Sequence, residues 1–202
     1  MSLDTYANLK TDIAAWLERD DLTDQIDTFI DLAEAKHKRE VRIRDMVTRA
    51  SLTVNARYVN LPSGFLEPMS LRLLTNPVTV LNSVSHYEMS RVRVETTGKP
   101  KYYSFNGTEI EFDRAADQSY DGEILYYAEL TPLSDDDTTN AILTRAPDLY
   151  LYGALIAAEP YLMNDPRIQT WAALYNSGVT AINAMDRKKP GPLFSRVMGA
   201  TP

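Results

Sequence analysis

The chain has 202 residues, of which 44 % are hydrophobic and 24 % charged, and its formal net charge is −7. This length predicts one domain or two small ones, and the acidic balance argues against a domain built for bulk nucleic-acid binding. The absence of cysteine excludes disulfides and thiolate metal sites. Because neither a signal peptide nor an apolar run of about 20 residues is present, we expect a protein that acts without a membrane and without export by that route.

The first part of the chain has the apolar spacing of two helices. In the first, five apolar residues share one face: Tyr6, Leu9, Ile13, Trp16 and Leu17. The second is expected over residues 24–45, with acidic residues in its first half and basic residues in its second half. That order suits the helix dipole. Together these two helices predict an αα-hairpin.

The middle of the chain has the pattern of short β-strands. Residues 47–54 predict a strand, and residues 57–61 predict its hairpin partner. Asn106-Gly107 signals another hairpin. A short helix is expected over residues 83–89. Further strands are expected over residues 70–75, 78–81, 102–105, 109–112 and 122–130.

Helical spacing returns after an acidic loop over residues 133–139. The run 149–163 is apolar nearly all round, which is typical of a buried helix, and Pro160 should kink or end it. Asp165-Pro166 is a suitable start for the last long helix. One stripe of that helix is apolar: Ile168, Trp171, Ala172, Tyr175, Val179 and Ile182.

These elements predict an α+β fold. Residues 1–45 and 140–188 should form a helical bundle from two helical hairpins, because each hairpin has one large apolar face to bury. Residues 46–132 should form an inserted module of short antiparallel strands. Residues 189–202 follow as a separate C-terminal tail, since Pro190-Gly191-Pro192 ends the last helix.

No catalytic or cofactor-binding motif emerges from the sequence, and we predict no catalytic, cofactor or metal site. His37 lies on an apolar helix stripe, where a core or interface histidine is the simplest interpretation. Glu109 and Glu111 share one face of a strand, which a glycosidase could use, although a solvated face explains them as well. The run Asp135–Asp137 lacks the spacing of a calcium loop. Glu159, in an apolar helix, needs a partner such as an arginine.

The basic cluster of residues 36–49 has three interpretations. It could contact DNA phosphates, form a solvated helix face, or meet a neighbouring chain. Contact with a neighbour is favoured, because charged residues continue the apolar stripe of the helix. The candidate inter-subunit residues are Lys38, Arg39, Glu40, Arg42 and Arg44.

The C-terminal tail carries apolar residues outside the predicted bundle. Chain ends are ordered where something holds them, and an apolar segment fits a groove of a partner. We therefore expect residues 189–202 to dock in a groove of a partner. The expected contacts are Leu193, Phe194, Val197 and Met198.

Short motifs in three parts of the chain form a recognisable pattern. The N-terminal part contributes residues 5–10 (TYANLK), 16–17, 22–26, 29–35 and 42–44, and the middle part contributes residues 61–68 (LPSGFLEP) and 70–73. The C-terminal part contributes residues 150–155 (YLYGAL), 161–163, 165, 171 and 175. Together they resemble the adaptor proteins of bacteriophage head-to-tail connectors, over nearly all of residues 1–188. These are patterns of structural residues and not a catalytic signature.

The resemblance implies a structural virion protein located between head and tail and synthesised in the host cytoplasm. It implies a homo-oligomeric ring, commonly of about twelve copies, which attaches to the portal protein and offers a docking platform to a tail or nozzle protein. DNA would pass through the central channel without specific binding. Some relatives are linked to cell-wall hydrolysis, but no catalytic residue of that activity maps onto this sequence.

Three hypotheses therefore remain open. The first is the structural adaptor just described, which performs no chemical step. The second is a virion-associated peptidoglycan hydrolase that uses carboxylates. The third is a soluble binding module without a role in a phage.

Overall fold

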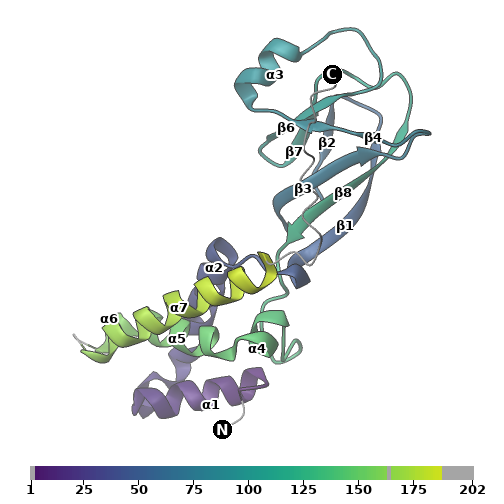
Figure 1. The fold of residues 1–202 in the computed structure, drawn as a ribbon. Coiled ribbons are helices and arrows are strands. Elements are labelled where there is room, and N and C mark those ends of the chain that lie inside the picture. The colour runs from purple at the N-terminus through teal and green to yellow at the C-terminus, as the bar shows by residue number, and fades with distance from the viewer. Residues whose placement is uncertain (1–2, 163–164, 188–202) are drawn as a thin grey trace, which may run out of the picture.

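The computed structural model describes residues 3–162 and 165–187, and it is a mixed α+β structure. Seven α-helices and two four-stranded sheets are present in these residues. Figure 1 shows the sheets at one end of the molecule with the short helix α3 (His86–Val92) beside them, and the other helices gathered at the opposite end. The predicted α+β class is confirmed at this level, and the regular four-helix bundle stays a prediction.

The N-terminal hairpin forms as expected, but its second helix is shorter than predicted. Helix α1 spans Tyr6–Leu17, a 3-10 helix η1 spans Asp20–Gln25, and α2 spans Ile26–Glu40. After α2 the backbone is extended, and Val41 and Ile43 are both fully buried. An extended chain points alternate residues to the same side, whereas a helix would place these two on different faces. Burial of both residues therefore ends α2 before residue 45.

The C-terminal helices are interrupted near Pro160, as the sequence predicts. Helices α4 (Ala141–Arg145) and α5 (Pro147–Ala157) are followed by α6 (Glu159–Leu162) and by α7 (Arg167–Arg187). The break falls at Ala158, upstream of Pro160, because the proline ring clashes with the carbonyl group four residues earlier. Pro147 occupies the first turn of α5, where a missing N–H costs nothing.

Helix α5 is central to the helical part and packs against α1, α2 and α7. Its approach to α2 is close: a Cβ atom added at Gly153 would lie 2.9 Å from the Cβ atom of Ala33. Only glycine permits that spacing without a shift of one helix. The largest side chains buried between these helices include Phe29, Tyr150 and Tyr175.

The first sheet has the strand order β1-β8-β3-β4 and is antiparallel throughout. Its strands are β1 (Val47–Val54), β8 (Tyr120–Ala128), β3 (Phe65–Leu73) and β4 (Thr79–Val80). The predicted hairpin between residues 47–54 and 57–61 is wrong, because β1 pairs with β8 along its whole length. Alternating polarity identifies a strand and its buried face but does not identify its partner.

The second sheet has the strand order β2-β7-β6-β5. Its strands are β2 (Tyr58–Asn60), β7 (Glu109–Phe112), β6 (Tyr102–Asn106) and β5 (Asn82–Ser83). The predicted hairpin at Asn106-Gly107 is confirmed, and Gly107 has the positive φ of 60° that this turn requires.

One strand pair departs from the expected antiparallel module: β5 runs parallel to β6 over two residue pairs. Parallel neighbours need a crossover connection. Helix α3 (His86–Val92) lies in that connection, three residues later than the helix predicted over residues 83–89. The Ser85 side chain caps it by accepting a hydrogen bond from the Glu88 N–H.

Two separate apolar clusters hold the molecule together. One lies among the helices and also takes in Met46 and Leu133, next to the sheets. The other contains residues of both sheets, such as Leu71 and Ile124 from the first and Ile110 and Phe112 from the second. The two sheets therefore share one core. The division at residues 46–132 stays a prediction.

Candidate functional site

The predicted tail contacts fall outside the described residues. Leu193, Phe194, Val197 and Met198 all follow Arg187, the last residue that the structure describes. Their role in portal or neighbour contact stays a prediction.

The predicted basic cluster lies where the helices meet the first sheet. Lys38 forms an ion pair with Glu129, and Arg42 forms one with Glu67 at 3.1 Å. The Arg42 guanidinium also donates to the carbonyl oxygen of Lys38, at 2.9 Å. These two cations join the end of α2 to the sheet, and this gives them a function within the subunit itself.

The other members of the cluster reach the surface. Arg39, Glu40 and Arg44 are exposed. The Glu40 carbonyl accepts a hydrogen bond from the side chain of Asn183 on α7. Contact of these residues with a neighbouring subunit stays a prediction.

The two carboxylates of β7 have different surroundings. Glu111 is buried; it accepts a hydrogen bond from the Tyr58 hydroxyl at 3.3 Å and pairs with Arg93 at 3.5 Å. Glu109 lies at the turn of the β6–β7 hairpin and is half-buried. Since Glu111 already has two structural partners, the geometry favours a structural role for it.

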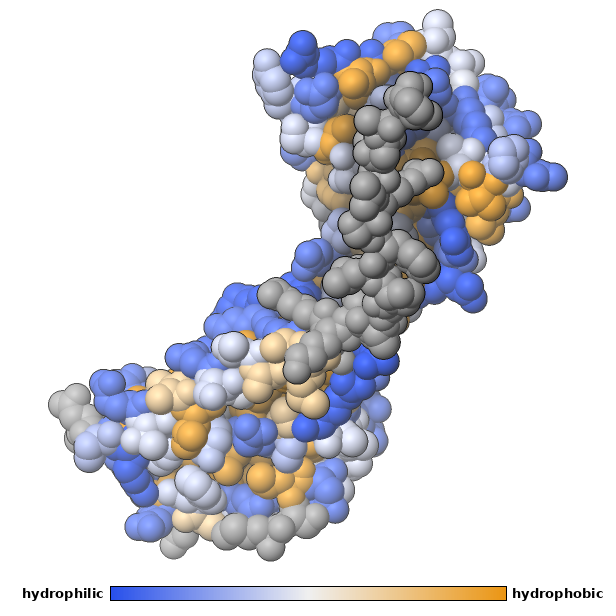
Figure 2. All heavy atoms as spheres, viewed as in Figure 1, coloured by the Kyte–Doolittle hydropathy of each residue, from blue (hydrophilic) through white to orange (hydrophobic). Residues whose placement is uncertain are grey.

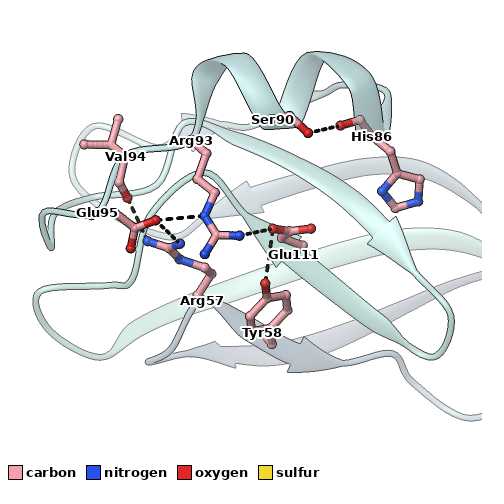
Figure 3. A network of polar contacts seen from close by, with 8 residues as sticks. All are labelled: Arg57, Tyr58, His86, Ser90, Arg93, Val94, Glu95 and Glu111. Carbon is pink, nitrogen blue, oxygen red and sulfur yellow. Dashed lines mark hydrogen bonds and ion pairs between the residues drawn. The ribbon is translucent and has the colours of Figure 1, made fainter.

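Figure 3 shows the network around Glu111 on the second sheet. Arg57 and Arg93 both contact the Glu95 carboxylate, at 3.1 and 2.9 Å, and Arg57 also donates to the carbonyl oxygen of Val94 at 2.7 Å. These bonds fasten the segment that follows α3 onto the sheet. The side chain of His86 lies apart from them in Figure 3.

The acidic loop presents solvated side chains. Asp135, Asp136 and Asp137 are all exposed, and the backbone N–H of Asp137 donates to the Ser134 hydroxyl. Among residues 3–162 and 165–187, no three His, Asp or Glu side chains are grouped in a way that could hold a metal ion.

A pocket that sequence reasoning missed lies at the junction of helices and sheets. Its volume is about 290 Å³, at the small end of the range for ligand pockets. It is lined by residues of α2, of the segment after β8, and of the start of the C-terminal helices. No sequence signal combines residues this far apart in the chain.

Hydrogen-bonded polar groups line one part of this pocket. Glu34 accepts hydrogen bonds at Oε1 from the Leu133 N–H at 2.8 Å and from the Tyr150 hydroxyl at 2.9 Å. The Asn140 amide donates to the same hydroxyl at 2.6 Å. Burial raises the pKa of the Glu34 carboxyl, although both hydrogen bonds oppose the rise.

His37 also lines the pocket and is buried, as predicted for a core histidine. Its ring stacks on Tyr175 at 5.9 Å and meets Tyr150 edge-on at 4.7 Å. Burial lowers the pKa of His37 to about 4, so the ring is neutral at pH 7.

Helix α7 presents an outward face without charge. No charged residue occurs from Ile168 to Met185. Leu174 and Met185 are 43 % and 71 % exposed. Figure 2 shows this part of the surface largely in pale and orange tones. An exposed helix face is ordinarily charged, and depletion of charge is typical of an interface core. The signal is present in the sequence as an uncharged run over residues 168–185.

A second exposed apolar group lies at the far end of the sheets. Leu74, Val78 and Val80 are 50 %, 55 % and 64 % exposed on and beside the edge strand β4. Tyr87, on the crossover helix α3, is 75 % exposed. Such surfaces mark protein contacts more often than catalytic sites.

The comparison with known families favours the first of these hypotheses. The family described as SU10 adaptor protein matches residues 4–196. The chain belongs to the SU10 adaptor protein family. The predicted resemblance to phage adaptors is therefore confirmed. A search of curated proteins finds no match.

Membership in the SU10 adaptor family supports a structural phage protein located in the virion. It also implies contacts with phage portal and tail proteins. Within the described ranges, no helix has both the length and the apolar character that a membrane crossing needs.

Proposed function

We propose that this chain is a ring subunit placed between the portal and the tail, where it works through buried contacts alone. The observation that carries the proposal is the family match across residues 4–196. A subunit of a closed head-to-tail ring needs two different contact surfaces, since such contacts are heterologous. The uncharged face of α7 is one candidate, and the exposed charges at the end of α2 are another.

The net negative charge of the chain also supports the proposal that the ring surrounds a DNA channel. The net charge of −7 is repeated in every copy, so a ring of about twelve copies would repel DNA phosphates and limit sticking during passage. DNA would then cross the ring without specific binding. The exposed apolar group around β4 is a candidate docking surface for the portal protein or for the tail or nozzle protein.

We propose that residues 189–202 strengthen attachment to the portal or to a neighbouring subunit. The test compares the full chain with a chain that ends at residue 188, each mixed with purified portal protein. Electron microscopy should show a ring on the portal for the full chain. The shortened chain should stay folded and bind portal more weakly. Equal portal affinity of the two chains would refute the role of the tail, and absence of any ring would refute the adaptor proposal.

A further inference from the structure

The pocket at the junction of helices and sheets combines an apolar wall with an acidic rim. Its apolar lining includes Met46, Leu66, Leu130 and Ile142. Three carboxylates, those of Asp31, Glu34 and Glu129, line it together with a single cation, Lys38. Such a site fits a segment that carries both apolar and basic side chains.

Burial of Glu34, part of the acidic rim, costs free energy when its carboxyl group is charged. Both of its hydrogen bonds fall on Oε1. Burial raises the pKa of this carboxyl, which means that its charged form is poorly solvated there. A cationic group beside Oε2 would offset that penalty.

The chain leaves its last described helix close to this pocket. The Asn183 side chain bonds to the Arg42 N–H and to the Glu40 carbonyl, both at 2.8 Å. Arg42 in turn bonds to the carbonyl of Lys38, at the pocket rim. Figure 1 shows this end of α7 near the junction of helices and sheets.

The sequence that follows α7 has the composition that the pocket requires. Residues 188–202 contain Lys188, Lys189 and Arg196 and no acidic residue, together with four large apolar residues. An extended segment of this length reaches about 50 Å, well beyond the few helical turns between Asn183 and the pocket. The charge, apolar content and length of residues 188–202 therefore match what the pocket requires.

We infer that the pocket is the docking site for the C-terminal segment of the same chain, residues 188–202. Apolar side chains of the segment lie against Leu66 and Ile142, and its basic side chains lie beside Glu34 and Asp31. Docking shelters these apolar groups before assembly. The inference goes beyond the adaptor function and concerns the free chain, so it holds whether or not a ring forms.

The test is photo-cross-linking in the purified full-length chain, with benzoylphenylalanine in place of Phe194. Mass spectrometry of the cross-linked peptides should locate the products within the pocket, on the segments that carry residues 31–38, 66 or 129–142. The products should run as monomers on a denaturing gel. Cross-links that map elsewhere, or a predominance of cross-linked dimers, would overturn docking within the same chain.

A charge variant tests the chemistry of the rim. The Asp31→Asn, Glu34→Gln pair keeps an acceptor for both hydrogen bonds of Glu34, so the fold should persist. It should reduce the yield of pocket cross-links at least about five-fold at low salt. The matched control, Asp24→Asn with Asp121→Asn, removes two exposed carboxylates outside the pocket and should leave the yield unchanged. Equal yields from the two pairs would overturn the assignment. Portal binding is measured separately, so failure of the adaptor proposal has its own readout.

Discussion

At the scale of single residues, His37 shows how burial turns a titratable group into a core residue. It is 2 % exposed, its Nε2 lies 3.4 Å from the carbonyl oxygen of Leu149, and its ring packs on two tyrosines. Protonation would place a charge in this apolar site. The folded chain therefore resists protonation until the pH falls to about 4.

Folding stability should consequently depend on pH through His37. In the unfolded chain histidine titrates near pH 6.5, whereas the pKa of His37 in the folded chain is about 4. Between these values the unfolded state binds more protons, so stability is full above about 6.5 and is lost as the pH falls towards 4. We predict that the native chain loses about 2 kcal/mol more between pH 7 and 4.5 than His37→Phe does.

Urea unfolding of both chains at the two pH values measures this difference. The exposed His86 supplies the control, because His86→Phe should keep the pH dependence of the native chain. If His37→Phe loses as much stability between the two pH values as the native chain does, the neutral state of His37 does not contribute to the pH dependence.

At the scale of elements, Asp113 joins the end of β7 to the start of β6. It is fully buried; its Oδ1 accepts hydrogen bonds from the backbone N–H groups of Lys101 and Tyr102, and its Oδ2 accepts one from Arg114 Nε at 2.9 Å. The carboxylate therefore replaces backbone partners that the short strands cannot supply.

Removal of the Asp113 carboxylate should lower the free energy of unfolding. We predict that Asp113→Ala lowers the free energy of unfolding by about 3 kcal/mol, because it leaves two part-buried N–H groups and the Arg114 side chain without their acceptor. Asp113→Asn, which retains one carbonyl oxygen, should lose less. Denaturant unfolding measures both, and the exposed Asp121→Ala should stay within about 0.5 kcal/mol of the native chain. Similar stability of the Asp113→Ala and Asp121→Ala chains would contradict the structural role.

At the scale of the whole molecule, the uncharged face of α7 is a surface that copies of an acidic protein can share at low electrostatic cost. Charges elsewhere on the subunit repel like charges on a neighbour, whereas Ser177 and Ala181 are exposed and neutral. We therefore assign this face to the subunit contact of the proposed ring.

New charges on this face should prevent ring assembly without unfolding the subunit. We predict that Ser177→Glu with Ala181→Glu reduces ring formation on portal at least about ten-fold and changes the unfolding midpoint by only a few degrees. Electron microscopy and thermal unfolding measure the two effects. The pair Gln118→Glu with Ser119→Glu adds the same charge to an exposed loop and should assemble normally. Normal rings from the α7 variant would exclude this face from the contact.

Local patterns predicted much of the fold correctly. The helical stripes, the break near Pro160 and the hairpin at Asn106-Gly107 depend on interactions within a few residues, so the sequence expresses them directly. The predicted end of α2 is wrong because the charged residues beyond Glu40 continue the helical pattern. Burial of Val41 and Ile43, which decided the boundary, is a tertiary effect.

The sequence by itself determined the types of the elements, their order and the family. Periodicity, caps and turn residues are local, and the motifs of the family are recognised by their order along the chain. Only the tertiary structure decided that β1 pairs with β8 and that Glu34, Glu129 and Tyr150 line one pocket. The physical reason is that strand pairing and pocket formation depend on which apolar faces bury one another most completely. That choice is made among distant segments, and a local pattern leaves it open.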